Sequence, residues 1–257
     1  LRTQAGQLSA ADENTLSALQ SKAEVHALAS VDVIVCTCSA AGGSQLATLS
    51  FTQCLIDEAA QISEPTALIP LVLGVRRAVL VGDPKQLGPS CKSKRAEAGG
   101  LGVSLFERLL LLKCPSTLLN EQFRMHPAIS SASSREFYKG AVHDAPSVRD
   151  GRRLQKSINF PWPDPSNPVL FIHHRVGAGG EERNAATGTS IQNPGEACVV
   201  VAVVLKFLSE GAAPTDVGVL TAYEAQRALI SRLLKGTLGA AVEVANVDAY
   251  QGREKTF

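Results

Sequence analysis

A short apolar run that ends in two adjacent carboxylates constrains this chain more than any other stretch. Cys54, Leu55 and Ile56 are followed directly by Asp57 and Glu58. Such a run predicts a short strand buried on both faces, of the kind found inside a parallel sheet with helices over it. Its last residues would emerge at the carboxyl edge of the sheet, where open α/β sheets bind their ligands.

Two carboxylates at such an edge have two explanations. In enzymes that transfer phosphoryl groups, an Asp at a strand end holds the Mg²⁺ that bridges the phosphates, because this hard cation prefers oxygen ligands. A neighbouring Glu can then polarise the attacking water as a general base. The alternative is a helix N-terminus, where capping and the macrodipole favour Asp and Glu. Asp57 and Glu58 alone leave both explanations open.

Apolar runs and amphipathic stretches alternate along the rest of the chain. This alternation predicts the α/β class, with mostly parallel sheets and right-handed crossovers. We place a domain boundary near Cys114 and Pro115, which gives domains 1–114 and 115–257. The predicted strands are 32–36, 54–56, 78–81, 169–172, 217–220 and 242–247; the predicted helices are 1–28 with Ser9 as a cap, 64–73, 98–112 and 195–209, with others after Pro127 and Thr221.

A second predicted strand also ends in polar residues. Residues 78–81 lead into Gly82, Asp83 and Gln86. A Gln at this edge can contact both a γ-phosphate and a water, and so report the nucleotide state to the rest of the domain. Gly-Asp-Pro by itself is simply a good turn. Beside the acidic strand end, the functional interpretation becomes the favoured one.

Three side chains further along have shapes that suit nucleotides or nucleic acid. Arg124 precedes a helix started by Pro127, and a guanidinium binds phosphate oxygens in a bidentate way. Most single Arg residues are solvated, but the rigid neighbours of Arg124 favour a positioned role. Thr221 and Tyr223, at a strand-to-helix junction, could hold a phosphate and stack on a base. A helix cap and a half-buried Tyr are the alternative.

Composition restricts the class of protein without selecting a function. The 257 residues carry a formal net charge of +1, with 45% hydrophobic and 19% charged residues, which is typical of a soluble globular protein. Near-neutral charge means that any nucleic-acid binding must come from a local groove. The six cysteines lack zinc-ligand spacing and indicate a reducing compartment, so we expect a cytoplasmic protein. No segment is long and apolar enough to predict a membrane span.

Four motifs, which begin at Leu55, Val81, Gln122 and Val247, occur in the order found in superfamily 1 helicases and resemble the motifs of that family. The sequence between the motifs resembles that of the RNA helicases of nonsense-mediated mRNA decay. The resemblance covers nearly all of the chain, and it makes residues 1–28 similar to the remnant of an inserted helical subdomain. The motifs occupy residues 55–59, 81–89, 122–127 and 247–255.

This resemblance implies two RecA-like domains, both incomplete here, with ATP in the cleft between them and single-stranded RNA across the top, translocating 5′ to 3′. It implies that Asp57 holds Mg²⁺ and that Glu58 activates water. The other implied roles are γ-phosphate sensing by Gln86, phosphate stabilisation by Arg124, adenine stacking by Phe123, ribose contact by Glu254, and an RNA path lined by Thr37, Thr221 and Tyr223.

Two departures from the family pattern bear on activity. No G-x-x-x-x-G-K-[ST] phosphate loop occurs in the sequence, and the family's last arginine motif would lie beyond Phe257. The chain begins with Leu1 rather than Met and looks like an excerpt of a longer polypeptide. We expect the 257 residues alone to hydrolyse ATP poorly or not at all, because charge neutralisation is nearly the whole of this catalysis.

The resemblance also implies partners: single-stranded RNA and the decay and translation-termination factors, with the enzyme a monomer. Two alternatives remain. One is a catalytically inactive, truncated module that binds RNA or protein. The other is a DNA helicase of the same superfamily, since single-strand channels read backbone and stacking more than base identity.

Overall fold

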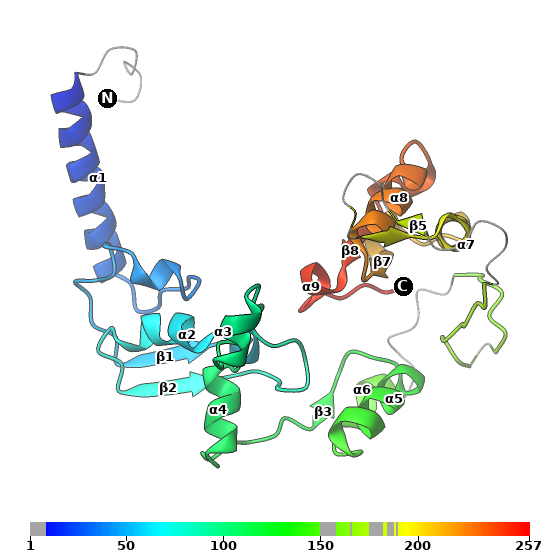
Figure 1. Ribbon diagram of the computed structural model, residues 1–257, viewed down its shortest axis with the longest axis horizontal. Helices are drawn as coiled ribbons and strands as arrows, with labels where there is room; N and C mark the ends of the chain where they lie inside the picture. The colour runs from blue at the N-terminus through cyan, green and yellow to red at the C-terminus, as the bar shows by residue number, and fades with distance from the viewer. Residues whose placement is uncertain (1–8, 150–157, 165, 175–181, 184–187, 189) are drawn as a thin grey trace. The chain divides into compact units, whose positions relative to one another are not determined.

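A computed structural model describes residues 9–149, 158–164, 166–174, 182–183, 188 and 190–257 of the chain (Figure 1). The chain divides into two compact units, residues 1–117 and residues 118–257. Each unit is described by itself below.

The first unit is built on a parallel strand pair. Its elements are α1 (Ala10–Ala29), η2 (Ala40–Gly42), β1 (Gln53–Ile56), η3 (Ala59–Gln61), α2 (Glu64–Leu71), β2 (Arg77–Leu80), α3 (Lys94–Ala98) and α4 (Leu105–Leu111). β1 and β2 run side by side in the same direction, with Leu55 opposite Val79 (Figure 1). The carboxyl ends of both strands therefore lie at one edge, as the sequence predicts.

Helix starts in this unit follow the capping residues. The Ser9 side chain accepts a hydrogen bond from the backbone of Asp12, and the Asp12 carboxylate accepts one from the Ser9 backbone, which makes a capping box. The first turn of α2 is tied to α4, because the Arg108 guanidinium donates to both carboxylate oxygens of Glu64 over 2.6 and 2.7 Å. The helices predicted at 64–73 and 98–112 are confirmed as α2 and α4, although both are shorter in the structure than predicted.

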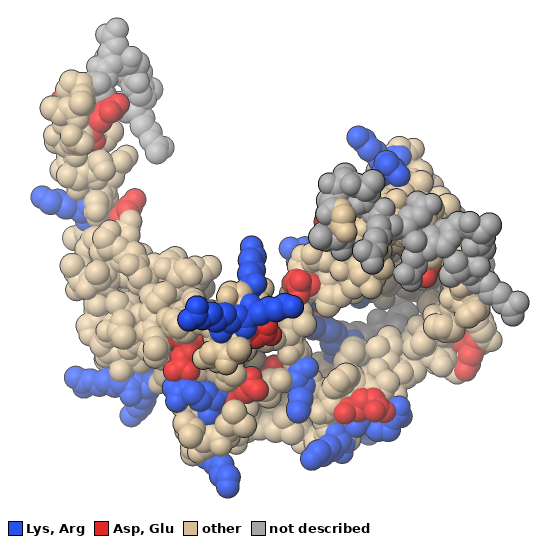
Figure 2. Space-filling model, in the orientation of Figure 1, with Lys and Arg blue, Asp and Glu red and all other residues tan. Residues whose placement is uncertain are grey.

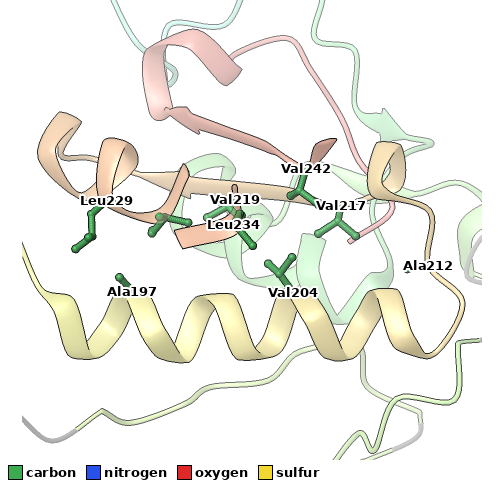
Figure 3. Close-up of a cluster of buried hydrophobic side chains, with 9 residues drawn as sticks. Ala197, Val204, Ala212, Val217, Val219, Leu229, Leu234 and Val242 are labelled. Carbon is green, nitrogen blue, oxygen red and sulfur yellow. The ribbon is translucent and has the colours of Figure 1, made fainter. Parts of the chain in front are cut away.

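An apolar core in the second unit packs between a helix and a parallel strand pair. The elements of this unit are β3 (Glu121–Gln122), α5 (Pro127–Tyr138), β4 (His143–Asp144), α6 (Pro146–Arg149), β5 (Glu182–Arg183), β6 (Ile191–Gln192), α7 (Pro194–Ser209), η5 (Pro214–Asp216), β7 (Gly218–Thr221), α8 (Glu224–Leu234), η6 (Leu238–Ala241), β8 (Glu243–Asn246) and α9 (Val247–Tyr250). Ala197 and Val204 on α7 point toward Val219 on β7 and toward Leu229 and Leu234 on α8 (Figure 3).

The strand pairs confirm the predicted α/β class. β1 with β2, β3 with β4, and β7 with β8 are parallel, and β5 with β6 is antiparallel. The connections β1–α2–β2 and β7–α8–β8 each pass through a helix, as a parallel pair requires.

Three details of the predicted strands are wrong. β1 is buried on one face only, because Ile56 is 3% exposed while Leu55 is 67% exposed. Residues 32–36 and 169–172 form no strand, and Val35 and Phe171 are exposed. A strand exists through its ladder of hydrogen bonds, and no strand assigned in the described part of the chain pairs with either segment.

One buried polar atom in the second unit gives a stability prediction. The Tyr250 hydroxyl lies against Gly218 and has no hydrogen-bond partner in the part of the chain that is described. Burial also raises the pKa of this hydroxyl, with the negative charge of Glu243 adding to the effect. Tyr250→Phe removes the unsatisfied group and is expected to raise the free energy of unfolding by about 1 kcal/mol.

Urea unfolding of the 257-residue chain followed by circular dichroism measures this change. Tyr223→Phe is the matched control, because the half-exposed ring of Tyr223 leaves its hydroxyl open to water and its loss is expected to be neutral. A lower midpoint for Tyr250→Phe would contradict the prediction.

Candidate nucleotide and RNA site

The Asp57-Glu58 pair lies in a sharp turn at the end of β1. Glu58 has φ 51° and ψ 37°, a left-handed conformation that non-glycine residues rarely adopt. The Asp57 carboxylate accepts from the Glu58 backbone N over 2.9 Å, and the Glu58 carboxylate accepts from the Gln61 amide over 2.8 Å. Asp57 is exposed and Glu58 is half-buried. The pair is therefore held at the strand end rather than inside a regular helix, although η3 begins directly after it.

The end of β2 is fastened to this turn. The backbone N of Ala59 donates to the carbonyl of Val81 over 2.8 Å, and the backbone N of Val81 donates to the carbonyl of Ile56 over 2.9 Å. A Cβ added to Gly82 would lie 2.8 Å from the backbone N of Ala60 and 3.2 Å from that of Ala59. Only glycine allows the two backbones to approach this closely. The two polar strand ends are therefore brought together.

The loop after β2 is organised around the Asp83 carboxylate. One of its oxygens accepts from the Lys85 backbone N and the other from the Gln86 side-chain amide, each over 2.9 Å. Gln86 is exposed at the same sheet edge as Asp57 and Glu58. Carboxylates and an amide therefore lie at one edge of the strand pair. Carboxylate oxygens are the ligands that a hard cation bound to a nucleotide prefers.

Arg124 lies in the turn before α5, in the second unit. Its guanidinium forms an ion pair with Glu254, and about half of each side chain is exposed. Phe123, beside it, is 57% exposed. Glu254 follows α9, in a segment that returns along β7 through hydrogen bonds of Phe257 with Asp216 and Gly218. Three residues assigned to nucleotide binding by resemblance are therefore near one another or adjacent in sequence.

The turn that carries Arg124 is fixed by Gln122, a residue to which the sequence analysis gives no role. The carbonyl oxygen of the Gln122 side chain accepts from the backbone N of Arg124 and of Met125. Its amide nitrogen donates to Asp144, which also accepts from Ser130. These hydrogen bonds, with that from Ser130 the larger influence, hold the pKa of Asp144 below its usual range. No local pattern in the sequence signals the contact between Gln122 and Asp144.

Thr221 and Tyr223 line a pocket at the carboxyl end of β7. The Thr221 hydroxyl accepts from the backbone N of Tyr223, and Tyr223 precedes α8 with half of its side chain exposed. Behind them, the buried Gln226 side chain accepts from the backbone N of Asn193 and donates to its carbonyl. The remaining lining residues are Ile191, Gln192, Glu196 and Ala222.

Thr37 is separate from this pocket along the chain and belongs to the first unit. Its hydroxyl accepts a hydrogen bond from the backbone N of Ala40, the first residue of the short helix η2, and its side chain is exposed. The sequence-predicted residues therefore form two groups, with Thr37, Asp57, Glu58 and Gln86 in the first unit and Phe123, Arg124, Thr221, Tyr223 and Glu254 in the second.

Charged side chains of both signs are mixed on the surface that Figure 2 shows. Lys and Arg are interspersed with Asp and Glu over the described residues of the face in Figure 2. Among the described residues, no group of three or more His, Cys, Asp or Glu side chains is arranged to hold a metal ion. The described helices also include none that is long and apolar enough to cross a membrane.

Comparison with known proteins identifies the class. Two family models, each with the description AAA domain, match the chain, one over residues 101–257 and the other over residues 2–94. The first match alone spans more than half of the chain, so the chain belongs to the AAA domain family. AAA-type helicase domains are RecA-like, which agrees with the parallel strand pairs and confirms the predicted fold class.

Particular relatives match the whole chain. The regulator of nonsense transcripts 1 homolog of Neurospora crassa is 43% identical over 263 residues, which cover 100% of this chain and 24% of that protein. The ATP-dependent helicase upf1 of Schizosaccharomyces pombe is 40% identical, covering 100% of this chain and 28% of its own length. The ATP-dependent helicase NAM7 of Saccharomyces cerevisiae is 39% identical, covering 100% and 26%. The chain thus spans about a quarter of the length of these relatives.

Proposed function

We propose that this chain is the part of an ATP-dependent RNA helicase of nonsense-mediated mRNA decay that carries the acidic edge of the first RecA-like domain and much of the second. The observation that carries the proposal is the joining of the two polar strand ends. The hydrogen bond from Ala59 to Val81 and the close approach at Gly82 hold Asp57 and Glu58 beside the Asp83–Gln86 loop. Similarity to helicases over the whole chain supports the same conclusion.

The first unit would work on the phosphate end of ATP. Asp57 presents an exposed carboxylate to Mg²⁺, and Glu58 accepts the proton of the attacking water as general base. Gln86, held by Asp83 over 2.9 Å, contacts the γ-phosphate and that water. Mg²⁺, when bound with the nucleotide, supplies charge neutralisation at the transferring phosphoryl group. The carboxylates fit this ion, whereas the sequence contains no G-x-x-x-x-G-K-[ST] loop to cradle the phosphates.

Residues of the second unit would also bind the nucleotide. Arg124 stabilises the negative charge of the phosphates, and Phe123 stacks on the adenine through its exposed ring. Glu254 contacts the ribose. Since Glu254 also pairs with Arg124, it keeps the guanidinium oriented until a phosphate takes its place.

The RNA path would use Thr37 in the first unit, and Thr221 and Tyr223 in the second. The pocket at Thr221 and Tyr223 lies at the N-terminal ends of α7 and α8, where backbone N–H groups favour phosphate. The half-exposed ring of Tyr223 offers a stacking platform, which is worth about 1–3 kcal/mol per base in single-strand binding proteins.

Partners and location follow from the same proposal. We expect a monomer that acts in the cytoplasm on single-stranded RNA, together with decay and translation-termination factors. The names of the relatives refer to nonsense transcripts, which supports the proposed role in nonsense-mediated decay.

A chimeric helicase tests the proposal. In the Saccharomyces cerevisiae helicase NAM7, the stretch that aligns with this chain is replaced by these 257 residues. RNA-stimulated ATP hydrolysis by the chimera is compared with that of the unaltered yeast protein and of the chain alone. Turnover in the chimera but not in the chain alone is the expected result.

Two further arms decide between the alternatives. Stimulation by single-stranded DNA but not by RNA of the same sequence would favour a DNA helicase. A chimera that is folded by circular dichroism and binds RNA, yet hydrolyses no ATP, would overturn the enzyme proposal in favour of a binding module.

A further inference from the structure

The turn that carries Arg124 takes its shape from one side chain. The Gln122 side-chain oxygen accepts from the backbone N of Arg124 over 2.9 Å and from that of Met125 over 2.7 Å. Its nitrogen donates to the carbonyl of Met125 over 2.7 Å. Three backbone groups of this turn are therefore satisfied by a single half-buried amide, and the direction of the Arg124 side chain depends on where that amide is held.

The amide is held by Asp144, which lies 22 residues further along the chain. β3 and β4 pair Gln122 with Asp144, and the same Asp144 oxygen accepts from the Gln122 amide over 2.6 Å and from the Ser130 hydroxyl over 2.5 Å. Ser130 is a buried residue of α5, 3% exposed. Asp144 therefore connects the Arg124 turn to the helix that follows it.

The backbone of Asp144 is also fixed. The Arg149 guanidinium donates to the Asp144 carbonyl over 2.9 Å, and the backbone N of Ala145 donates to the carbonyl of Gln122 over 2.9 Å. Ala145 and Val148, on either side of the start of α6, are buried. A carboxylate held on both its backbone and its side chain can determine the position of its partner, because little of it is free to move.

We propose that Asp144 is a positioning residue for Arg124, acting through Gln122 to hold the guanidinium where it meets the nucleotide phosphates. The expected effect on catalysis rests on the proposed function. The expected effect on the conformation of the Arg124 turn does not. A displacement of about 1 Å at such a group can lower turnover up to a hundredfold. What Asp144 supplies is hydrogen-bond acceptance rather than charge, so Asn, which keeps one acceptor oxygen, should replace it.

The structural part is tested in the 257-residue chain by amide hydrogen exchange. In Asp144→Ala, the backbone amides of Arg124 and Met125 are expected to exchange about tenfold faster, because their acceptor is no longer held. Asp144→Asn is expected to exchange like the parent chain. Asp164→Ala is the matched control, since Asp164 accepts from Ser166 in another turn. Unchanged exchange in Asp144→Ala would overturn the proposal, whether or not the chain belongs to a helicase.

The catalytic part is tested in the chimeric helicase. Asp144→Ala is expected to lower kcat roughly tenfold to a hundredfold with little change in the KM for ATP, and Asp144→Asn is expected to restore it. In an Arg124→Ala background, Asp144→Ala should lower kcat no further, because the guanidinium that Asp144 positions is gone. An equal loss in both backgrounds would mean a structural role only. An inactive parent chimera would instead count against the proposed function.

Discussion

Glu58→Gln in the chimeric helicase is expected to lower RNA-stimulated ATP turnover about a thousandfold, because general-base catalysis typically contributes 10²–10⁴-fold. The amide keeps the size of the side chain and can still accept from Gln61, so the turn after β1 should be retained. It cannot take a proton from water. RNA binding without nucleotide should be unchanged, since RNA contacts are assigned to other residues.

The matched control is Glu64→Gln, because Glu64 begins α2 and forms an ion pair with Arg108. The Glu64→Gln substitution removes a surface ion pair and should leave turnover near that of the parent chimera. Steady-state phosphate release at saturating ATP and RNA measures both variants. Retention of more than about a tenth of the parent turnover by Glu58→Gln would exclude the general-base role.

Local sequence patterns predict best those elements that are determined by residues close to them in sequence. The capping box at Ser9, and the prolines in the first turns of α2, α5 and α7, mark helix starts within a residue or two of where the structure has them. Apolar runs that end in polar residues predict β1 and β2, and the parallel pairing of these strands follows from the helix between them. The carboxylate edge could be predicted because it needs only these two strand ends.

Burial could not be predicted in the same way. The exposed side chains of Leu55 and Val79 form one face of the β1–β2 pair, and the apolar sequence of each strand predicts that this face is covered. Whether it is covered depends on other segments and not on the strand itself. The strands predicted at 32–36 and 169–172 are wrong for the same reason, because an apolar run becomes a strand only when another strand pairs with it.

Contacts between distant residues are the other part of the site that the sequence does not reveal. Gln122 and Asp144 meet only because β3 and β4 pair, and each of those strands has two residues. Arg124 and Glu254 lie at opposite ends of the second unit in sequence, yet form an ion pair. Their individual roles follow from resemblance, whereas their mutual contact comes from the tertiary structure.

The second large effect is expected at Gly82, where the two polar strand ends touch. In Gly82→Val, the new Cβ would lie 2.8 Å from the backbone N of Ala60, a distance that real Cβ atoms essentially never show. The Ala59–Val81 hydrogen bond would then have to lengthen or break as the two strand ends separate. We expect the free energy of unfolding to fall by about 2–3 kcal/mol, as for other overpacked sites.

Turnover of the chimeric helicase should also fall in Gly82→Val, by about a hundredfold, because Gln86 moves away from Asp57 and Glu58. Urea unfolding and phosphate release measure the two effects. Gly102→Val is the control, since among the described residues a Cβ there would meet the flexible side chain of Glu97, at the ordinary contact distance of 3.6 Å. Loss of both stability and turnover distinguishes Gly82→Val from Glu58→Gln, which should lose turnover alone. Parent-like turnover in Gly82→Val would mean that the contact between the strand ends does not organise the site.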